Sequence, residues 1–253
     1  MELGLGLRTC FSLETKDPLF VNFKLSPSEI EAVQKKLPRG FRLVPVRFFE
    51  SDSTPNYWLS YNFYEIHYPK KELQAIKKVR CEINTFVQDD QGKKGIYVFC
   101  GSPYVSREKK FSILGWVCDW AERTVCFIYG CGRLIPLTYE LGQRKIQVHF
   151  ADGENRVALE QPLPPEERPE EVLSTDYLKY NDISFFNDAK TYDLVNVNSA
   201  FLSATFTCVD AHDLKGTSIR SVFLNRPPDR LAFHRGEITY SVVSMNSYER
   251  ASI

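Results

Sequence analysis

Short segments of β-type pattern, separated by turn residues, make up most of the chain. The segments before residue 101 are 18–25, 42–50, 57–67, 79–87 and 96–100. Those after it are 110–118, 124–129, 146–150, 156–159, 192–210, 217–224 and 237–243. A polar turn that contains glycine lies between 79–87 and 96–100, which predicts a β-hairpin. A similar turn between 146–150 and 156–159 predicts a second one.

One helix is predicted directly after the first strand. Ser26 can cap its amino end, Pro27 suits the first helical position, and Glu29 completes a capping box. Apolar residues then recur at helical spacing, and a Pro-Arg-Gly sequence at 38–40 ends the helix. One or two short helices and about a dozen strands predict a mainly β fold, a β-dominated α+β class built as a barrel or a sandwich.

The whole chain, residues 1–253, is predicted to form a single domain. Residues 161–171 read QPLPPEERPEE, and their prolines and glutamates indicate an exposed, stiff connector. We expect a loop there rather than a domain boundary, because the roughly 80 residues that follow fall short of the usual ~100 for a domain.

The composition is that of an ordinary globular protein, with 43% hydrophobic residues. The 32 Lys and Arg balance 32 Asp and Glu. A net charge of zero provides no long-range attraction to nucleic acid or to an anionic membrane surface, so we expect neither as a partner. No stretch approaches the ~18 apolar residues of a membrane span, and residues 1–25 lack the pattern of a signal peptide.

The seven cysteines are scattered and form no C-x-x-C motif. Four of them, Cys81, Cys100, Cys118 and Cys126, lie in strand-like apolar stretches, where a thiol packs as a small apolar side chain. We therefore expect buried thiols rather than disulfides, and a reducing, cytoplasmic location. The sequence leaves the oligomeric state open, a homo-oligomer included.

The motifs of common nucleotide, metal and serine-hydrolase sites are absent from the sequence. It contains no G-x-G-x-x-G, no P-loop, no H-E-x-x-H and no G-x-S-x-G. Asp210, His212 and Asp213 could offer a carboxylate and an imidazole at one strand end, but the spacing identifies no further ligand. We expect no metal and no cofactor.

Lys109 and Lys110 are the candidate reactive residues. They precede the β-type run 111–118, and two ammonium groups at a strand start usually mark a solvated edge. The functional alternative is an amine nucleophile, which attacks a carbonyl only when it is unprotonated. A second cation beside it and an apolar pocket both disfavour the charged form, and together they lower a lysine pKa by several units from ~10.4.

Three motifs occur in order between residues 18 and 135. Residues 20–48 read FVNFKLSPSEIEAVQKKLPRGFRLVPVRF, a strand that leads into a short helix ending at a proline. Glu82 on a strand, the turn DDQGKKG and Tyr97 follow. Lys109 and Lys110 then precede a hairpin pattern that ends in Tyr-Gly. This order resembles the acetoacetate decarboxylase-like family, and beyond residue 135 only general strand character matches.

The resemblance implies both a fold and a mechanism. Members of that family form a closed β-barrel-like cone with the active site inside. Lys109 would form a Schiff base with a keto acid, Lys110 would lower the pKa of Lys109, and Glu82 would position the substrate or transfer protons. Glu108 stands where the family has a proline, and a carboxylate there favours the charged form of Lys109.

Aromatic residues are frequent, with 18 Phe and 13 Tyr. Tyr61, Phe63, Tyr97 and Trp116 have two interpretations, sheet packing or the wall of a substrate-binding cavity. Three functions follow from these observations. The first is a lyase that acts on a keto acid or related carbonyl compound through Lys109. The others are a barrel that binds an apolar small molecule non-covalently, and a cyclase or isomerase of a polyketide-like specialised metabolite on the same scaffold.

Overall fold

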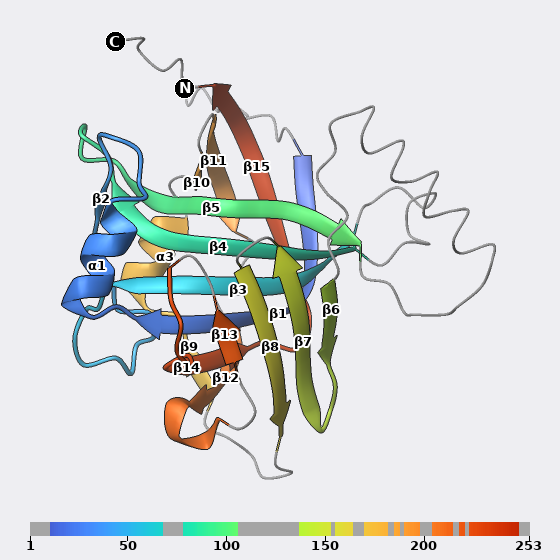
Figure 1. The fold of residues 1–253 in the computed structure, drawn as a ribbon. Helices are drawn as coiled ribbons and strands as arrows, with labels where there is room; N and C mark the ends of the chain where they lie inside the picture. The colour runs from blue at the N-terminus through green and yellow to red at the C-terminus, as the bar shows by residue number, and fades with distance from the viewer. Residues whose placement is uncertain are drawn as a thin grey trace.

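Two β-sheets form the framework of the protein (Figure 1). The computed structural model describes residues 11–67, 78–105, 137–152, 155–163, 170–181, 185–187, 190–197, 204–214, 218–220 and 223–247. The larger sheet contains β1 (Phe11–Lys24), β2 (Arg42–Leu43), β3 (Trp58–His67), β4 (Lys78–Gln88), β5 (Lys94–Val105), β9 (Glu170–Val172), β10 (Phe185–Asn187), β11 (Lys190–Val197), β12 (Thr205–Asp210), β14 (Arg230–Phe233) and β15 (Glu237–Ser247). The smaller sheet contains β6 (Leu137–Leu141), β7 (Lys145–Asp152), β8 (Asn155–Pro162) and β13 (Ser218–Arg220).

The helices are few and short. Among the residues that the structure describes they are α1 (Pro27–Gln34), α3 (Thr175–Asn181) and the 3-10 helix η2 (Ala211–Asp213). The prediction of a mainly β fold with one or two short α-helices is therefore confirmed. None of the helices in the described ranges is both long and apolar enough to span a bilayer.

Seven strands of the larger sheet form a ring of pairings. β15, β11, β10, β5, β4, β3 and β1 follow one another, and β1 pairs back to β15 through residues 11–16 and 237–242. The second half of β1 pairs instead with β14, from which β12 and β9 continue the sheet. The sheet thus forks along β1, because β15 pairs with the first half of one edge of β1 and β14 pairs with the second half of the same edge.

Two hydrogen bonds between Asp17 and Gly236 lie at this fork. The Asp17 N–H donates to the Gly236 carbonyl over 2.9 Å, and the Gly236 N–H donates to Asp17 Oδ1 over 3.0 Å. Both residues have positive φ, 50° at Asp17 and 142° at Gly236. The second of these values suits glycine in particular, since a side chain there is strained. The local bend moves β1 from one partner strand to the other.

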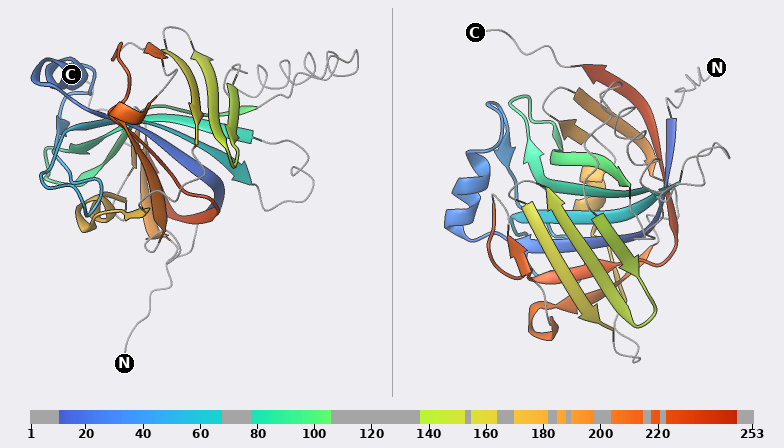
Figure 2. Two further views of the ribbon diagram at one scale, coloured as in Figure 1. Left: turned by 90° about the horizontal axis from the view of Figure 1, so that it is seen from below. Right: turned by 45° about the vertical axis from the view of Figure 1, so that its right-hand side comes forward.

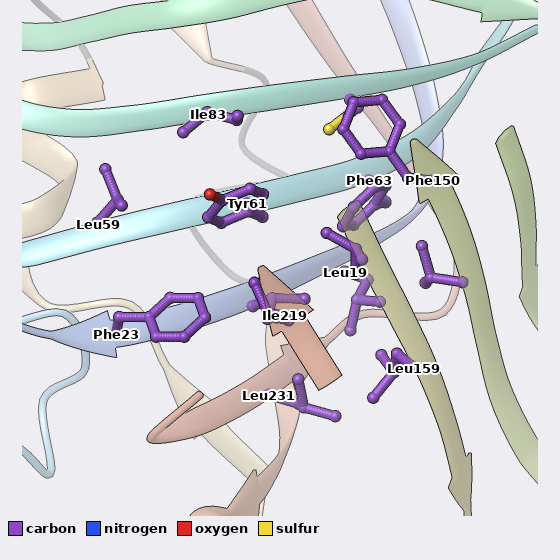
Figure 3. Packing of buried hydrophobic residues seen from close by; sticks show 14 of the residues in the cluster. Leu19, Phe23, Leu59, Tyr61, Phe63, Ile83, Phe150, Leu159, Ile219 and Leu231 are labelled. Atoms are coloured by element: carbon purple, nitrogen blue, oxygen red, sulfur yellow. The ribbon is translucent and has the colours of Figure 1, made fainter. Parts of the chain in front are cut away.

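The smaller sheet covers one face of β1, β3 and β4, whereas α3, β10 and β11 lie on the opposite side (Figures 1 and 2). Side chains from both sheets meet in one hydrophobic cluster between them (Figure 3). Its members include Leu19, Phe23, Tyr61, Phe63 and Ile83 of the larger sheet and Val148, Phe150 and Leu159 of the smaller one. Because side chains alternate along a strand, the intervening residues of β1, β3 and β4 point away from the smaller sheet.

A second hydrophobic cluster occupies part of that other side. Phe20, Trp58, Phe86 and Phe206 belong to it, together with Tyr177 of α3. The rings of Phe20 and Phe206 stack with centroids 5.3 Å apart, which joins β1 to β12. The segment between β2 and β3 adds Phe48 and Phe49, so aromatic side chains fill this end of the sheet face.

Several predicted elements have their counterparts in the structure. The strands predicted at 18–25 and 57–67 are β1 and β3, and the two predicted hairpins are β4–β5 and β7–β8. Helix α1 begins at Pro27 with Ser26 as its N-cap, and the Ser26 N–H donates to Glu29 Oε2 over 2.8 Å. The segments predicted at 110–118 and 124–129 lie outside the described residues.

Two predictions about local structure, at 42–50 and 161–171, are corrected in part, and residues 164–169 lie outside the described residues. Only Arg42 and Leu43 of the segment 42–50 lie in a strand, and further along Val46 and Phe49 form isolated bridges. The prolines and glutamates at 161–171 predicted an exposed loop, but both ends of this stretch belong to strands β8 and β9. Gln161 of this stretch is buried, and its side chain donates hydrogen bonds to the carbonyls of Asp213 and Pro162. Whether residues 1–253 form one domain remains a prediction.

Candidate functional site

Buried polar side chains gather on the face of β1, β3 and β4 that points away from β6–β8. We call this face the inner face, because β10 and β11, which complete the ring, lie on that side (Figure 1). We call the group the polar cluster. It comprises Asn22, Ser60, Asn62, Arg80, Glu82 and Asn84. Arg80 is partly exposed, and each of the other five is at most 7% exposed.

Strand register brings these residues together. Asn22 on β1 lies opposite Ser60 on β3, and Ser60 lies opposite Asn84 on β4. One step along, Asn62 lies opposite Glu82. Residues directly opposite on neighbouring strands share a face and have Cβ atoms ~5 Å apart, so three strands present one continuous polar surface.

Two polar contacts hold parts of the cluster in place. The Ser60 hydroxyl donates to Asn22 Oδ1 over 2.6 Å. Arg80 Nη2 lies 2.6 Å from Glu82 Oε1, and the side chains are 27% and 9% exposed. A charge-assisted hydrogen bond of this length keeps the carboxylate oriented. Glu82 therefore offers a positioned, buried carboxylate that can handle protons or hold a ligand.

Two amide atoms of the cluster are buried without a hydrogen-bond partner among the described residues: Nδ2 of Asn22 and Oδ1 of Asn62. An unsatisfied buried donor or acceptor costs about 1–3 kcal/mol, and most native buried polar groups avoid this cost. The burial of one unmatched donor and one unmatched acceptor therefore needs a physical explanation.

The predicted substrate-binding aromatics lie on the opposite face of the same strands. Tyr61 faces Ile83 across β3 and β4, and Phe63 packs against Phe150 of the smaller sheet with ring centroids 6.2 Å apart. Tyr97 lies opposite Thr85, also in the cluster between the sheets. These three rings thus lie on the face opposite Glu82, in the apolar cluster between the sheets, and their role in substrate binding stays a prediction.

The other predicted site residues belong to the segment 106–136, which the structure does not describe. Lys109, Lys110 and Trp116 lie outside the described residues, and so does Glu108. Glu82 is the one predicted catalytic residue that the described ranges contain. Asn22, Ser60, Asn62 and Asn84 were not predicted as site residues.

Arg230, which pairs with Asp52 over 3.3 Å and with Asp210 over 3.0 Å, is the centre of a second charged group in the described part of the chain. Within it, no three His, Cys, Asp or Glu side chains gather as metal ligands, and His212 is 78% exposed beside Asp213. Cys81 and Cys208 are buried thiols, and the Cys208 thiol donates to the backbone carbonyl of Phe206 on the same strand.

Comparisons with known proteins provide no family assignment. No protein-family profile and no curated protein matches the sequence. One solved structure with some similarity is the enduracididine biosynthesis enzyme MppR in complex with pyruvate. The match has a TM-score of 0.49 and 8% sequence identity, and covers 99% of this chain and 95% of the other. Such a similarity carries no functional information, and membership of the acetoacetate decarboxylase-like family stays a prediction.

Proposed function

We propose that the protein is an enzyme that acts on a small polar carbonyl compound, such as a keto acid, bound at the polar cluster. The supporting observation is the buried Glu82, paired with Arg80 and surrounded by amide and hydroxyl side chains. Polar groups cost stability when they are buried, so their concentration on one sheet face is typical of a binding site rather than of a packed core.

Lys109 supplies the covalent chemistry in this proposal. Its unprotonated amine attacks the substrate carbonyl carbon, and loss of water gives an iminium. In a β-keto acid the bond to the carboxylate then breaks, carbon dioxide leaves, and the iminium takes up the electron pair as an enamine. Protonation of the enamine and hydrolysis by water release the ketone and restore the lysine. Glu82 is the proposed proton carrier or substrate-positioning group.

Trapping with borohydride tests the covalent step. The protein is incubated with acetoacetate, oxaloacetate or other keto acids, reduced, digested and analysed by peptide mass spectrometry. We expect a substrate-derived mass on Lys109, and loss of that adduct in Lys109→Met. Lys145→Met is the matched control, because Lys145 is an exposed lysine on β7. Glu82→Gln should slow formation of the adduct at pH 7 by about tenfold or more, as is usual when a general acid or base is lost.

A cyclase or isomerase that uses acid–base groups alone is the second candidate. Glu108 favours it, because a carboxylate beside Lys109 stabilises the ammonium form that cannot attack a carbonyl. Turnover without any trapped adduct, lost in Glu82→Gln, would support this alternative. Non-covalent binding of an apolar ligand is the least supported function, because such a ligand leaves the amides of the polar cluster unpaired.

A further inference from the structure

The two unmatched amide atoms of the polar cluster carry chemical information about the ligand. Asn22 is fully buried and Asn62 is 6% exposed. Asn22 already accepts a hydrogen bond from Ser60 at its oxygen, which leaves the Nδ2 end as the unmatched donor. Asn62 has an unmatched acceptor at Oδ1. A ligand that satisfies both must accept from the first residue and donate to the second.

The positions of these residues limit the size of that ligand group. Asn62 follows Ser60 by two residues on β3, and Ser60 lies opposite Asn22, so the two asparagines are diagonal neighbours on the inner face. Diagonal neighbours lie ~7–8 Å apart, a span that a planar group of a few atoms can bridge between two amide side chains. Asn62 also lies opposite Glu82 on β4, so the Glu82 carboxylate and its partner Arg80 lie beyond Asn62 as seen from Asn22.

We infer that Asn22 and Asn62 bind a terminal carboxamide of the substrate and so determine specificity within the class of short oxo acids. The carboxamide oxygen accepts from Asn22 Nδ2, and its NH₂ donates to Asn62 Oδ1. This inference rests on the proposed function for the identity of the reacting end, and extends it to the other end of the molecule.

Other polar groups fit the pair less well. A carboxylate only accepts, so it would place a second oxygen against Asn62 Oδ1. An ammonium only donates, so it would leave Asn22 Nδ2 unmatched. A hydroxyl does both, but from one atom, which spans two side chains less easily than the separate oxygen and nitrogen of an amide.

A pair of isosteric compounds tests the inference directly. 2-Oxosuccinamate and 4-methyl-2-oxopentanoate have nearly the same shape, but the first ends in a carboxamide and the second in two methyl groups. We expect the wild-type protein to prefer the amide by about tenfold or more, both in calorimetric binding and in borohydride trapping, because a site built for hydrogen bonds rejects an apolar isostere. Asn62→Leu and Asn22→Leu should each reduce this preference to about twofold or less.

Matched variants separate binding from structure. Asn62→Leu removes the desolvation cost of an unmatched acceptor, so an unchanged or raised unfolding midpoint is expected whether or not the residue binds ligand. Asn22→Leu also removes the acceptor of the Ser60 hydroxyl, so a lowered midpoint is expected there in either case. Selectivity between the isosteres changes only if the residue touches the ligand. Asn62→Ala serves if the leucine variant does not fold. Thr85→Val is the control, since Thr85 lies on the opposite face of β4 and donates to the Trp58 carbonyl.

A second pair without a keto group separates this inference from the proposed function. Succinamate and 4-methylpentanoate cannot form an imine, but they keep the carboxamide and its isostere. An asparagine-dependent preference for succinamate without any trapping of the oxo acids would support the inference and contradict the lyase chemistry. Trapping of both oxo acids without preference would support the chemistry and overturn the inference. The inference would also be overturned if the wild-type protein bound neither 2-oxosuccinamate nor succinamate. Equal selectivity in the wild type and the asparagine variants would overturn it too, and is expected if a water molecule satisfies the Asn22 and Asn62 side chains.

Discussion

At the scale of single residues, burial controls the reactivity of the Cys208 thiol. Burial, together with a smaller contribution from the nearby Glu171 carboxylate, raises its pKa from 9.0 to about 12. A pKa of about 12 in place of 9.0 lowers the fraction of thiolate about a thousandfold, and the thiolate is the form that reacts. We expect Cys208 in the native protein to resist alkylation by iodoacetamide at pH 8, and to react readily in urea. Peptide mass spectrometry of the labelled protein measures both rates.

The same shift has a consequence for stability. The thiol stays neutral in the folded protein up to about pH 12, whereas it ionises near pH 9 when the chain unfolds. Stability from this residue is therefore complete below pH 9 and is lost as the pH rises from there toward 12. Rapid native-state labelling at pH 8 would contradict the assignment of Cys208 as a buried, inert thiol.

At the scale of elements, the first turn of α1 depends on a charged contact with the segment before β14. Arg226 donates to Glu29 over 2.9 Å, to Asp229 over 2.7 Å and to the Lys24 carbonyl over 2.6 Å. Burial alone would raise the pKa of Glu29. The hydrogen bonds from Arg226 and from the Ser26 N–H outweigh it, and the pKa lies below 4.5.

Glu29→Ala should therefore lower the free energy of unfolding by about 1–2 kcal/mol at pH 7, since it removes the carboxylate of the capping box and one of the partners of Arg226. A carboxyl with a lowered pKa stabilises the fold above its unfolded pKa, and this contribution is lost as the pH falls through the folded value. The difference between variant and wild type should thus shrink below pH 4.5. Urea unfolding at several pH values measures it. Glu31→Ala, an exposed site on the same helix, should have little effect; an equal loss there would contradict the role of the contact.

Local sequence patterns were enough to predict α1 and most strands. Ser26, Pro27 and Glu29 predicted the helix start because capping is a local interaction. The segment 42–50 was misassigned because Pro45 removes a backbone donor, and because Val46 and Phe49 pair outside the segment, with Asn56 and with the distant Leu173. Strand pairing of this kind depends on tertiary contacts that a local pattern does not contain.

The candidate site was predictable only in part. Glu82 was singled out from a resemblance, and it does lie buried on the inner face beside Arg80. Ser60 and Asn62 were missed because they alternate with apolar Tyr61, the pattern expected of a strand with one solvated face. Only the ring of strands shows that this polar face is buried. Tyr61 was predicted as a substrate-binding residue because of the aromatic-rich stretch around it, and it lies in the apolar cluster between the sheets.

At the scale of the whole molecule, the two faces of β1, β3 and β4 have different tasks. One face packs against β6–β8 in a continuous apolar cluster, and the other carries the polar cluster. Because alternate residues of the same strands serve both faces, damage to the packing between the sheets should reach the candidate site. We therefore expect the two sheets to unfold together, as the prediction of a single domain requires.

Leu159→Ala tests this expectation from the smaller sheet. Leu159 on β8 is fully buried in the shared cluster, and truncation of such a residue costs about 2–5 kcal/mol. If the sheets form one cooperative unit, hydrogen exchange of the slowest amides in β3 and β4 should accelerate by the same free energy as that in β7 and β8. Glu160→Ala, exposed on the same strand, controls for changes in local strand structure. Acceleration confined to β6–β8 would mean that the smaller sheet opens on its own. The polar cluster would then rest on the larger sheet alone, and Leu159→Ala should leave ligand selectivity at Asn22 and Asn62 unchanged.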